Sequence, residues 1–340
     1  MAKKKKKKEK RVVAVVAHTG KTLGQGLDEL RRVLAAAGQP SPLWREVSTS
    51  REAPKAVRRA IEKGARLIFV WGGDGMVQRC VDAVGGSKDV ELAIVPAGTA
   101  NLLAGNLGVP ADIAQAVEIG LRGTRRKLDV GKVNGERFAV MAGVGFDARM
   151  IGGVSPAEKR RTGRLAYFRS GFQAMRAPLV RAAVTVDGSV WFEGKASAVL
   201  VANVGTVTGG LEVFPSASPS DGLLDVGVVT AHGTLEWLSV FSRVAAKSLE
   251  QSPHVQRTRG KKIVVELGRK SPYELDGGGR GAVKRLEFRV KPAAISLCVP
   301  RARAKVSPAL SGSRARARPR RDTAGTRTAP PAAAEPAPLH

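Results

Sequence analysis

The sequence predicts an α/β domain followed by an all-β domain, and three observations support this fold class. Apolar runs alternate with amphipathic segments over residues 12–127, which is typical of a parallel sheet with helices on both faces. Short apolar strands separated by glycine turns follow over residues 128–300, which is typical of a β-sandwich or barrel. A chain of 340 residues with 43% hydrophobic residues is long enough for two cores. We expect an N-terminal three-layer α/β domain and a C-terminal β-sandwich.

The N-terminal segment should consist of buried strands, each followed by a helix. Apolar runs predict the strands, and apolar residues at helical spacing, which end near a glycine, predict the helices. The predicted strands are 12–17, 67–71 and 92–95, and the predicted helices are 23–37, 54–63, 77–84 and 111–121, with a short helical stretch from Leu102 to Leu107.

The C-terminal segment should consist mainly of short strands. Asn134-Gly135 and Asp187-Gly188 are strong hairpin signals, because both residue pairs accept left-handed backbone angles. The predicted strands are 128–133, 137–145, 184–186, 190–192, 198–204, 223–229, 261–267, 286–290 and 295–299. Two helical insertions, 155–177 and 234–249, interrupt them.

The net charge of +28 indicates anionic partners. Much of it lies in residues 1–11 and 301–340, which have too few large apolar residues to fold and should be disordered tails. Membrane headgroups, nucleic acid and phosphorylated substrates all fit such a charge. The insertion at 155–177 places basic residues before aromatic ones, which fits a membrane-surface helix. The alternative is a helix that packs on the sheet with solvated arginines.

The two cysteines and the apolar runs bear on location. Cys80 and Cys298 each lie in an apolar segment, so we expect buried free thiols in a reducing cytoplasm. No apolar run approaches the ~20 residues that span a bilayer. The first apolar run is also too short for the core of a signal peptide. These features predict a cytoplasmic protein.

Loops at the ends of the first strands are typical of phosphate binding. Residues 72–75 (Gly-Gly-Asp-Gly) follow one strand and residues 96–101 follow the next, so both should face one crevice. Glycines let backbone N–H groups approach a phosphate, and Asp74 can hold a cation that bridges phosphate oxygens. Residues 18–21 form a third strand-end loop with a glycine and a lysine. The alternative for 72–75 is a tight turn in which Asp74 caps a helix.

Three segments, in this order, resemble the diacylglycerol kinase/sphingosine kinase superfamily: 72–75, 96–102 and 275–277 (Leu-Asp-Gly). Weaker similarities at 128–131, 142–147, 163–167 and 220–226 extend the resemblance over residues 12–300. The resemblance implies an N-terminal ATP-binding domain (12–127) and a C-terminal lipid-substrate sandwich (128–300), with ATP and Mg²⁺ between them. It also implies that Asp276 is the general base on a lipid hydroxyl.

The resemblance and the loop chemistry together give a set of expected site residues. The expected catalytic residues are Asp276 and Asp74. The expected metal ligands are Asp74 and, at a separate cation site, Asp221. The expected nucleotide-binding residues are Thr19, Gly20, Lys21, Gly72, Gly73, Asp74, Gly75, Gly98, Thr99 and Asn101.

The chain departs from the family pattern near its motifs. Met76 replaces a threonine, Arg79 replaces a glutamate, and Gly278 replaces the glutamate that usually follows Asp-Gly. We therefore expect an ATP-dependent lipid kinase that acts peripherally at an anionic membrane, with two alternatives. One is an NAD kinase-like phosphotransferase. The other is a catalytically impaired protein that binds nucleotide or lipid. We expect a membrane rather than a nucleic acid as partner, and the sequence leaves a homo-oligomer open.

Overall fold

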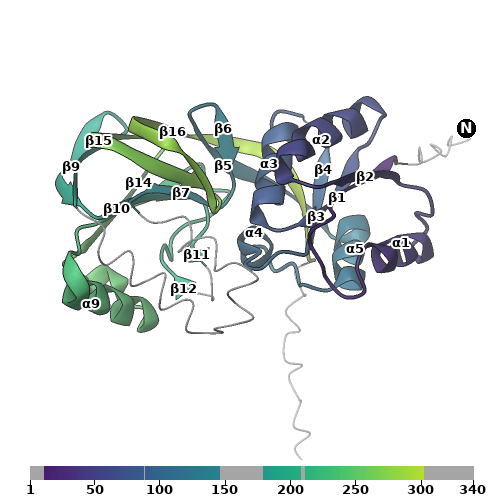
Figure 1. The fold of residues 1–340 in the computed structure, drawn as a ribbon, viewed down its shortest axis with the longest axis horizontal. Helices are drawn as coiled ribbons and strands as arrows, with labels where there is room; N and C mark the ends of the chain where they lie inside the picture. Colours follow the sequence, from purple (N-terminus) through teal and green to yellow (C-terminus); the bar gives the residue numbers. More distant parts are fainter. Residues whose placement is uncertain (1–10, 88, 146–178, 208–210, 302–340) are drawn as a thin grey trace, which may run out of the picture. The chain divides into compact units, whose positions relative to one another are not determined.

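A computed structural model describes residues 11–87, 89–145, 179–207 and 211–301 (Figure 1). The predicted tails, apart from Arg11 and Arg301, and the predicted insertion at 155–177 lie outside the described residues. The described residues fall within one folded unit, and their strands form one large sheet and a separate two-stranded ribbon.

The N-terminal half contains a four-stranded parallel sheet in the order β4-β3-β1-β2. Its strands are β1 (Val13–His18), β2 (Leu43–Val47), β3 (Leu67–Gly72) and β4 (Glu91–Pro96). The three apolar strands predicted from the sequence are confirmed. The sequence did not predict β2, because this edge strand buries only Val47 and has no apolar run.

Helices cover both faces of this sheet, which confirms the predicted three layers (Figure 1). Val16 and Val70 pack with helices on one face, whereas Val15 and Phe69 pack with helices on the other, as the alternation of a strand requires. The first face carries α2 (Ala53–Glu62) and α3 (Asp74–Val84), and the second carries α1 (Leu27–Ala36) and α5 (Ile113–Arg122). The short helices α4 (Leu102–Asn106) and η1 (Ser50–Glu52) complete this half.

The C-terminal half is formed by antiparallel strands around its own apolar core, in which Phe138 and Phe288 meet edge to face at 6.1 Å. Both predicted hairpins are present, and Asn134 and Asp187 have the positive φ angles that such turns need. The elements are β5 (Thr124–Val133), β6 (Glu136–Phe138), β7 (Met141–Val144), β8 (Val180–Val186), β9 (Ser189–Ala196), β10 (Ala198–Ala202), β11 (Thr206–Val207), β12 (Leu211–Glu212), β13 (Leu224–Val229), α9 (Gly233–Ala245), η3 (Leu249–Gln251), β14 (Val255–Gly260), β15 (Lys262–Leu275) and β16 (Gly278–Val299).

The long strand β16 joins the two halves. It pairs with β15 and β5 in antiparallel fashion, and near its end Ser296 and Leu297 pair with β4 in parallel fashion. The sequence predicted two separate strands at 286–290 and 295–299, but a bulge between Lys291 and Ile295 interrupts only the register with β5. Strand β16 therefore places two regions on one hydrogen-bonded sheet. One is the turn between β15 and β16, which holds Asp276, and the other is the pair of strands β3 and β4, which the glycine loops follow.

Candidate active site

The loops after β3 and β4 touch each other backbone to backbone. A Cβ atom placed on Gly98 would lie 2.3 Å from the Cα of Gly73, and one placed on Gly73 would lie 3.0 Å from the Cα of Gly98. Only glycine fits at position 98, and a side chain at position 73 would require the neighbouring backbone to move. The prediction that both loops meet in one place is therefore confirmed, and no side chain separates their backbones.

The loop after β1 lies beside the same strands. The Trp71 indole Nε1 donates a hydrogen bond to the carbonyl of Lys21 at 3.1 Å, which ties the loop to the end of β3. The N–H of Gly20 donates to Nδ1 of His18 at 3.1 Å. Burial, followed by the charge of Lys21, lowers the pKa of His18, so the ring remains a neutral acceptor at pH 7. Thr19 is exposed, and its backbone N–H bonds to Val47.

Asn101 shapes the loop after β4 with its own side chain. Its Oδ1 accepts from the N–H of Gly98 at 2.9 Å, and its Nδ2 donates to the carbonyls of Pro96 and Gly98 at 3.2 and 3.0 Å. Asn101 also adopts a φ of 49°, which asparagine tolerates better than most residues. Both ends of this amide are used inside the loop, whereas the side chain of Thr99 is exposed.

Asp74 is the first residue of α3, beside the loop after β4. Its Oδ1 accepts from the N–H of Leu103 at 3.4 Å. Burial raises the pKa of Asp74, and backbone N–H groups, led by that of Leu103, oppose this shift. A partly desolvated carboxylate of this kind gains from a bound cation.

Asp276 lies in the turn between β15 and β16, where it adopts a φ of 46° and is only 3% exposed. Its Oδ2 accepts from the N–H of Ala139 at 2.8 Å, and its Oδ1 accepts from the N–H groups of Val140 and Met141, both at 2.9 Å. Burial and, to a smaller extent, the negative charge of Asp74 together raise the pKa of Asp276 to about 7 against the effect of these three bonds. The two acids predicted to be catalytic are thus close enough to influence each other.

The three hydrogen bonds leave part of the Asp276 carboxylate available. An ionised carboxylate has about four acceptor positions, and Oδ1 uses two while Oδ2 uses one. Oδ2 can therefore accept one further hydrogen bond. A carboxyl group with a pKa near 7 is well matched to accepting a proton at neutral pH.

A charged network that the sequence did not reveal lies beside this turn. Glu136 accepts from Nη1 of Arg79 at 2.9 Å, and from Nη2 and Nε of Arg280 at 2.7 and 2.9 Å. The hydrogen bond from Arg280 is the main cause of the lowered pKa of Glu136. Nη1 of Arg280 donates to the carbonyl of Gly278, and a Cβ on Gly278 would lie 2.9 Å from that nitrogen. The two departures Arg79 and Gly278 therefore belong to one arrangement.

Asp221, the predicted ligand of a separate cation, contacts a cation of the chain itself. Its Oδ2 accepts from the Arg259 guanidinium, and its Oδ1 accepts from the N–H of Leu223 at 3.0 Å. The same guanidinium lies 3.4 Å from the buried Asp225. Among the described residues, no three acidic, histidine or cysteine side chains converge as a metal site. Metal binding by Asp221 stays a prediction.

The crevice fits the phosphates of ATP with a divalent ion. Gly73 and Gly98 bring the two loop backbones together, and a Cβ on the adjacent Gly75 would meet nothing within 4 Å, so backbone N–H groups there are not covered by a side chain. Mg²⁺ usually takes one or two carboxylates and completes its shell with waters and substrate phosphates. Asp74 can supply such a carboxylate, so three converging protein ligands are not needed here.

Comparison with known proteins agrees with this site. Residues 12–133 match the diacylglycerol kinase catalytic domain, and residues 140–299 match the YegS C-terminal NAD kinase beta sandwich-like domain. The described β-rich half thus corresponds to a β-sandwich domain, as predicted.

Two curated relatives show the family. A "Probable lipid kinase YegS-like" from Pseudomonas aeruginosa is 30% identical over 307 residues, which cover 85% of this chain and 94% of that protein. A "Diacylglycerol kinase" from Bacillus subtilis is 28% identical over 231 residues, covering 66% of this chain and 75% of that protein. The chain belongs to this family of diacylglycerol kinases and YegS-like lipid kinases. It is accordingly an ATP-dependent phosphotransferase.

A solved structure shows that the fold is shared. The crystal structure of a diacylglycerol kinase from Bacillus anthracis str. Sterne superimposes with a TM-score of 0.69 and covers 85% of this chain and 97% of that one. Its sequence identity is 23%, so the similarity is one of fold.

Proposed function

We propose that the chain transfers the γ-phosphate of ATP to the hydroxyl group of a lipid, such as a diacylglycerol, at an anionic membrane surface. The environment of Asp276 carries this proposal: a buried carboxylate with a pKa of about 7 and one acceptor position left at Oδ2. No helix among the described residues is long and apolar enough to cross a bilayer. A lipid substrate would therefore be reached from the membrane surface.

Asp276 would act on the substrate hydroxyl. Its free position at Oδ2 accepts the hydroxyl proton as the oxygen attacks the γ-phosphorus, and the bond to ADP breaks. The N–H groups of Ala139, Val140 and Met141 hold the carboxylate in one orientation through this step. Because Asp276 is only 3% exposed, bulk water competes poorly with the substrate for it.

The glycine loops would hold the nucleotide. Backbone N–H groups around Gly73 and Gly98 would bind phosphate oxygens, and Asp74 would hold Mg²⁺, whose positive charge would offset the negative charge of the phosphates. Lys21 is the cation best placed to stabilise the transferred group, since its loop is tied to β3 and it forms no ion pair within the described part of the chain. Arg79, in contrast, is bound to Glu136.

A substrate panel tests this function. The full chain is incubated with labelled ATP and Mg²⁺ and with diacylglycerol, a sphingoid base, a total membrane lipid extract or NAD. We expect labelled phosphate in a lipid product and none on NAD. Label on NAD alone would support the NAD kinase-like alternative. ATP binding without any labelled product would support the catalytically impaired alternative.

A further inference from the structure

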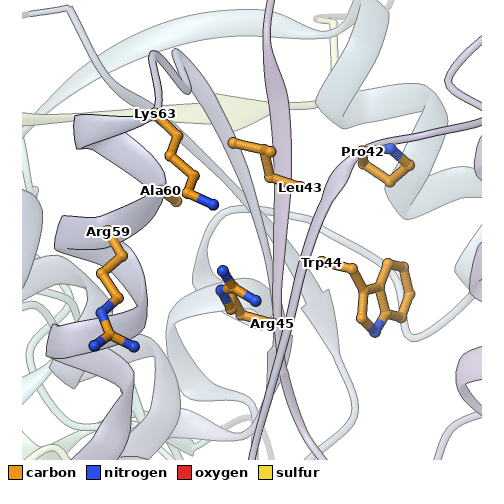
Figure 2. A pocket seen from close by; sticks show the side chains of 7 residues that line it. All are labelled: Pro42, Leu43, Trp44, Arg45, Arg59, Ala60 and Lys63. Carbon is orange, nitrogen blue, oxygen red and sulfur yellow. The ribbon is translucent and has the colours of Figure 1, made fainter.

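A small concavity opens between the edge strand β2 and helix α2 (Figure 2). Its volume is about 230 Å³. It lies apart from the candidate active site, because Leu43 begins β2 and Lys63 follows the end of α2, whereas the glycine loops leave the opposite, carboxyl ends of the strands. We call it the β2–α2 pocket, and it is lined by Pro42, Leu43, Trp44, Arg45, Arg59, Ala60 and Lys63.

Three cations line the β2–α2 pocket: Arg45, Arg59 and Lys63. Figure 2 shows the Lys63 ammonium directed toward the Arg45 guanidinium, with Arg59 extending from the same helix as Ala60. Within the described residues none of the three cations forms an ion pair or a side-chain hydrogen bond. The neighbouring Glu46 does not neutralise them, because it pairs with Arg31. The pocket therefore has a concentrated positive charge.

The remaining lining suits a small ester rather than a bare ion. Leu43 and Ala60 supply an apolar floor, since Ala60 is buried and Leu43 packs against the same core. Strand β2 is at the end of the described sheet order, so one row of its backbone N–H groups has no strand partner and can donate to an anion. Sites for drug-sized ligands measure about 300–1,000 Å³, so this smaller volume fits a headgroup-sized ligand.

We propose that the β2–α2 pocket binds the phosphate group of an anionic ester, with Arg45, Arg59 and Lys63 as its cationic ligands. Arginine and lysine are the residues that proteins use for phosphate recognition. A phospholipid headgroup and a soluble phosphate ester share this chemistry. The β2–α2 pocket is separate from the candidate active site. Binding to the pocket can therefore be tested without measuring catalysis.

The test compares two triple variants of the full chain that carry the same net charge. The pocket variant is Arg45→Gln/Arg59→Gln/Lys63→Gln. The control variant removes three exposed cations of the same region that do not line the pocket: Lys55→Gln/Arg58→Gln/Arg66→Gln. One arm measures binding of glycerol 3-phosphate by NMR titration, and the other measures sedimentation with phosphatidylcholine vesicles that contain phosphatidylglycerol.

We expect the pocket variant to bind about a hundredfold more weakly than the control variant, since each cation near an anionic surface contributes about fivefold. A difference in the soluble arm identifies a free phosphate ester, and a difference confined to the vesicle arm identifies a lipid headgroup. Equal binding by both variants in both arms would overturn the proposal. Should the pocket variant fail to fold, Lys63→Gln and Lys55→Gln replace the triple variants, and we expect an approximately fivefold difference between them.

Discussion

Two Asp-Gly turns in the C-terminal half differ sharply in what surrounds their carboxylates. Asp221-Gly222 and Asp276-Gly277 both place a glycine at positive φ, 76° and 78° respectively. The Asp221 carboxylate contacts the Arg259 guanidinium. The Asp276 carboxylate is buried, and among its described contacts it is held by backbone N–H groups only.

This difference decides the chemistry of the two groups. The Asp221 carboxylate is already bonded to the Arg259 guanidinium, which suits a structural contact and not a proton acceptor. The Asp276 carboxylate is buried and has no directly bonded cation among its described contacts, and burial raises its pKa to about 7, which suits a general base. The dipeptide alone, without its surroundings, therefore does not identify the catalytic acid. Three predictions test this comparison.

The largest expected effect is on catalysis by Asp276. Asp276→Asn removes the proton acceptor and should lower kcat about 10²- to 10⁴-fold while the KM for ATP changes little. Initial rates with the lipid substrate identified by the panel measure both quantities. Asp221→Asn is the matched control, because it makes the same change in the other Asp-Gly turn, and it should leave kcat largely intact. Full turnover by Asp276→Asn would remove Asp276 from the catalytic step.

A smaller effect, on the stability of the fold, is expected when the Arg259 contact of the Asp221-Gly222 turn is removed. Arg259→Gln leaves the 3%-exposed Asp225 without its cationic partner and should destabilise the fold by about 1–3 kcal/mol. Urea unfolding measures this change, and the kcat of the folded variant should match that of the natural chain. A large loss of kcat at unchanged stability would mean that the Asp221 turn takes part in the reaction.

The smallest effect is a shift in a titration. As the proposed proton acceptor, Asp276 would act in its ionised form, so kcat/KM should rise with pH and level off above about 7. The charge of Asp74 raises the pKa of Asp276, so Asp74→Asn should lower that pKa. Carboxyl ¹³C NMR of the nucleotide-free protein measures the shift without requiring activity. An unchanged or higher pKa in this variant would contradict the coupling between the two acids.

Local patterns in the sequence were sufficient to predict the strands that bury a continuous run of apolar residues. Strand β3 is buried along its whole length and was predicted to within one residue. Strand β2 lies at the sheet edge, and the partly exposed β14 consists mostly of polar residues, so neither presents such a run. The prediction of two separate strands at 286–290 and 295–299 was wrong, because β16 pairs with three other strands and this pairing outweighs the local sequence.

The site was predictable where short motifs carry it and unpredictable where distant residues meet. The glycines of both loops were identified, since close backbone contact requires glycine. The Glu136 network was not, because Arg79 and Arg280 are separated from Glu136 by 57 and 144 residues. The one sequence feature near Glu136 was the Asn134-Gly135 hairpin. It predicts that Glu136 lies at the start of a strand, but not which residues Glu136 contacts.

Strand β16 also limits how the crevice can open. A swing of one half of the molecule against the other would break the backbone hydrogen bonds that β16 makes with β4 or with β15 and β5. Hinges elsewhere usually lie in loops, where few hydrogen bonds are lost. Strand β16 thus connects the turn that holds Asp276 with the strand that precedes one of the glycine loops. For the proposed function, substrate entry and product release would then depend on loops and side chains rather than on a swing of the two halves.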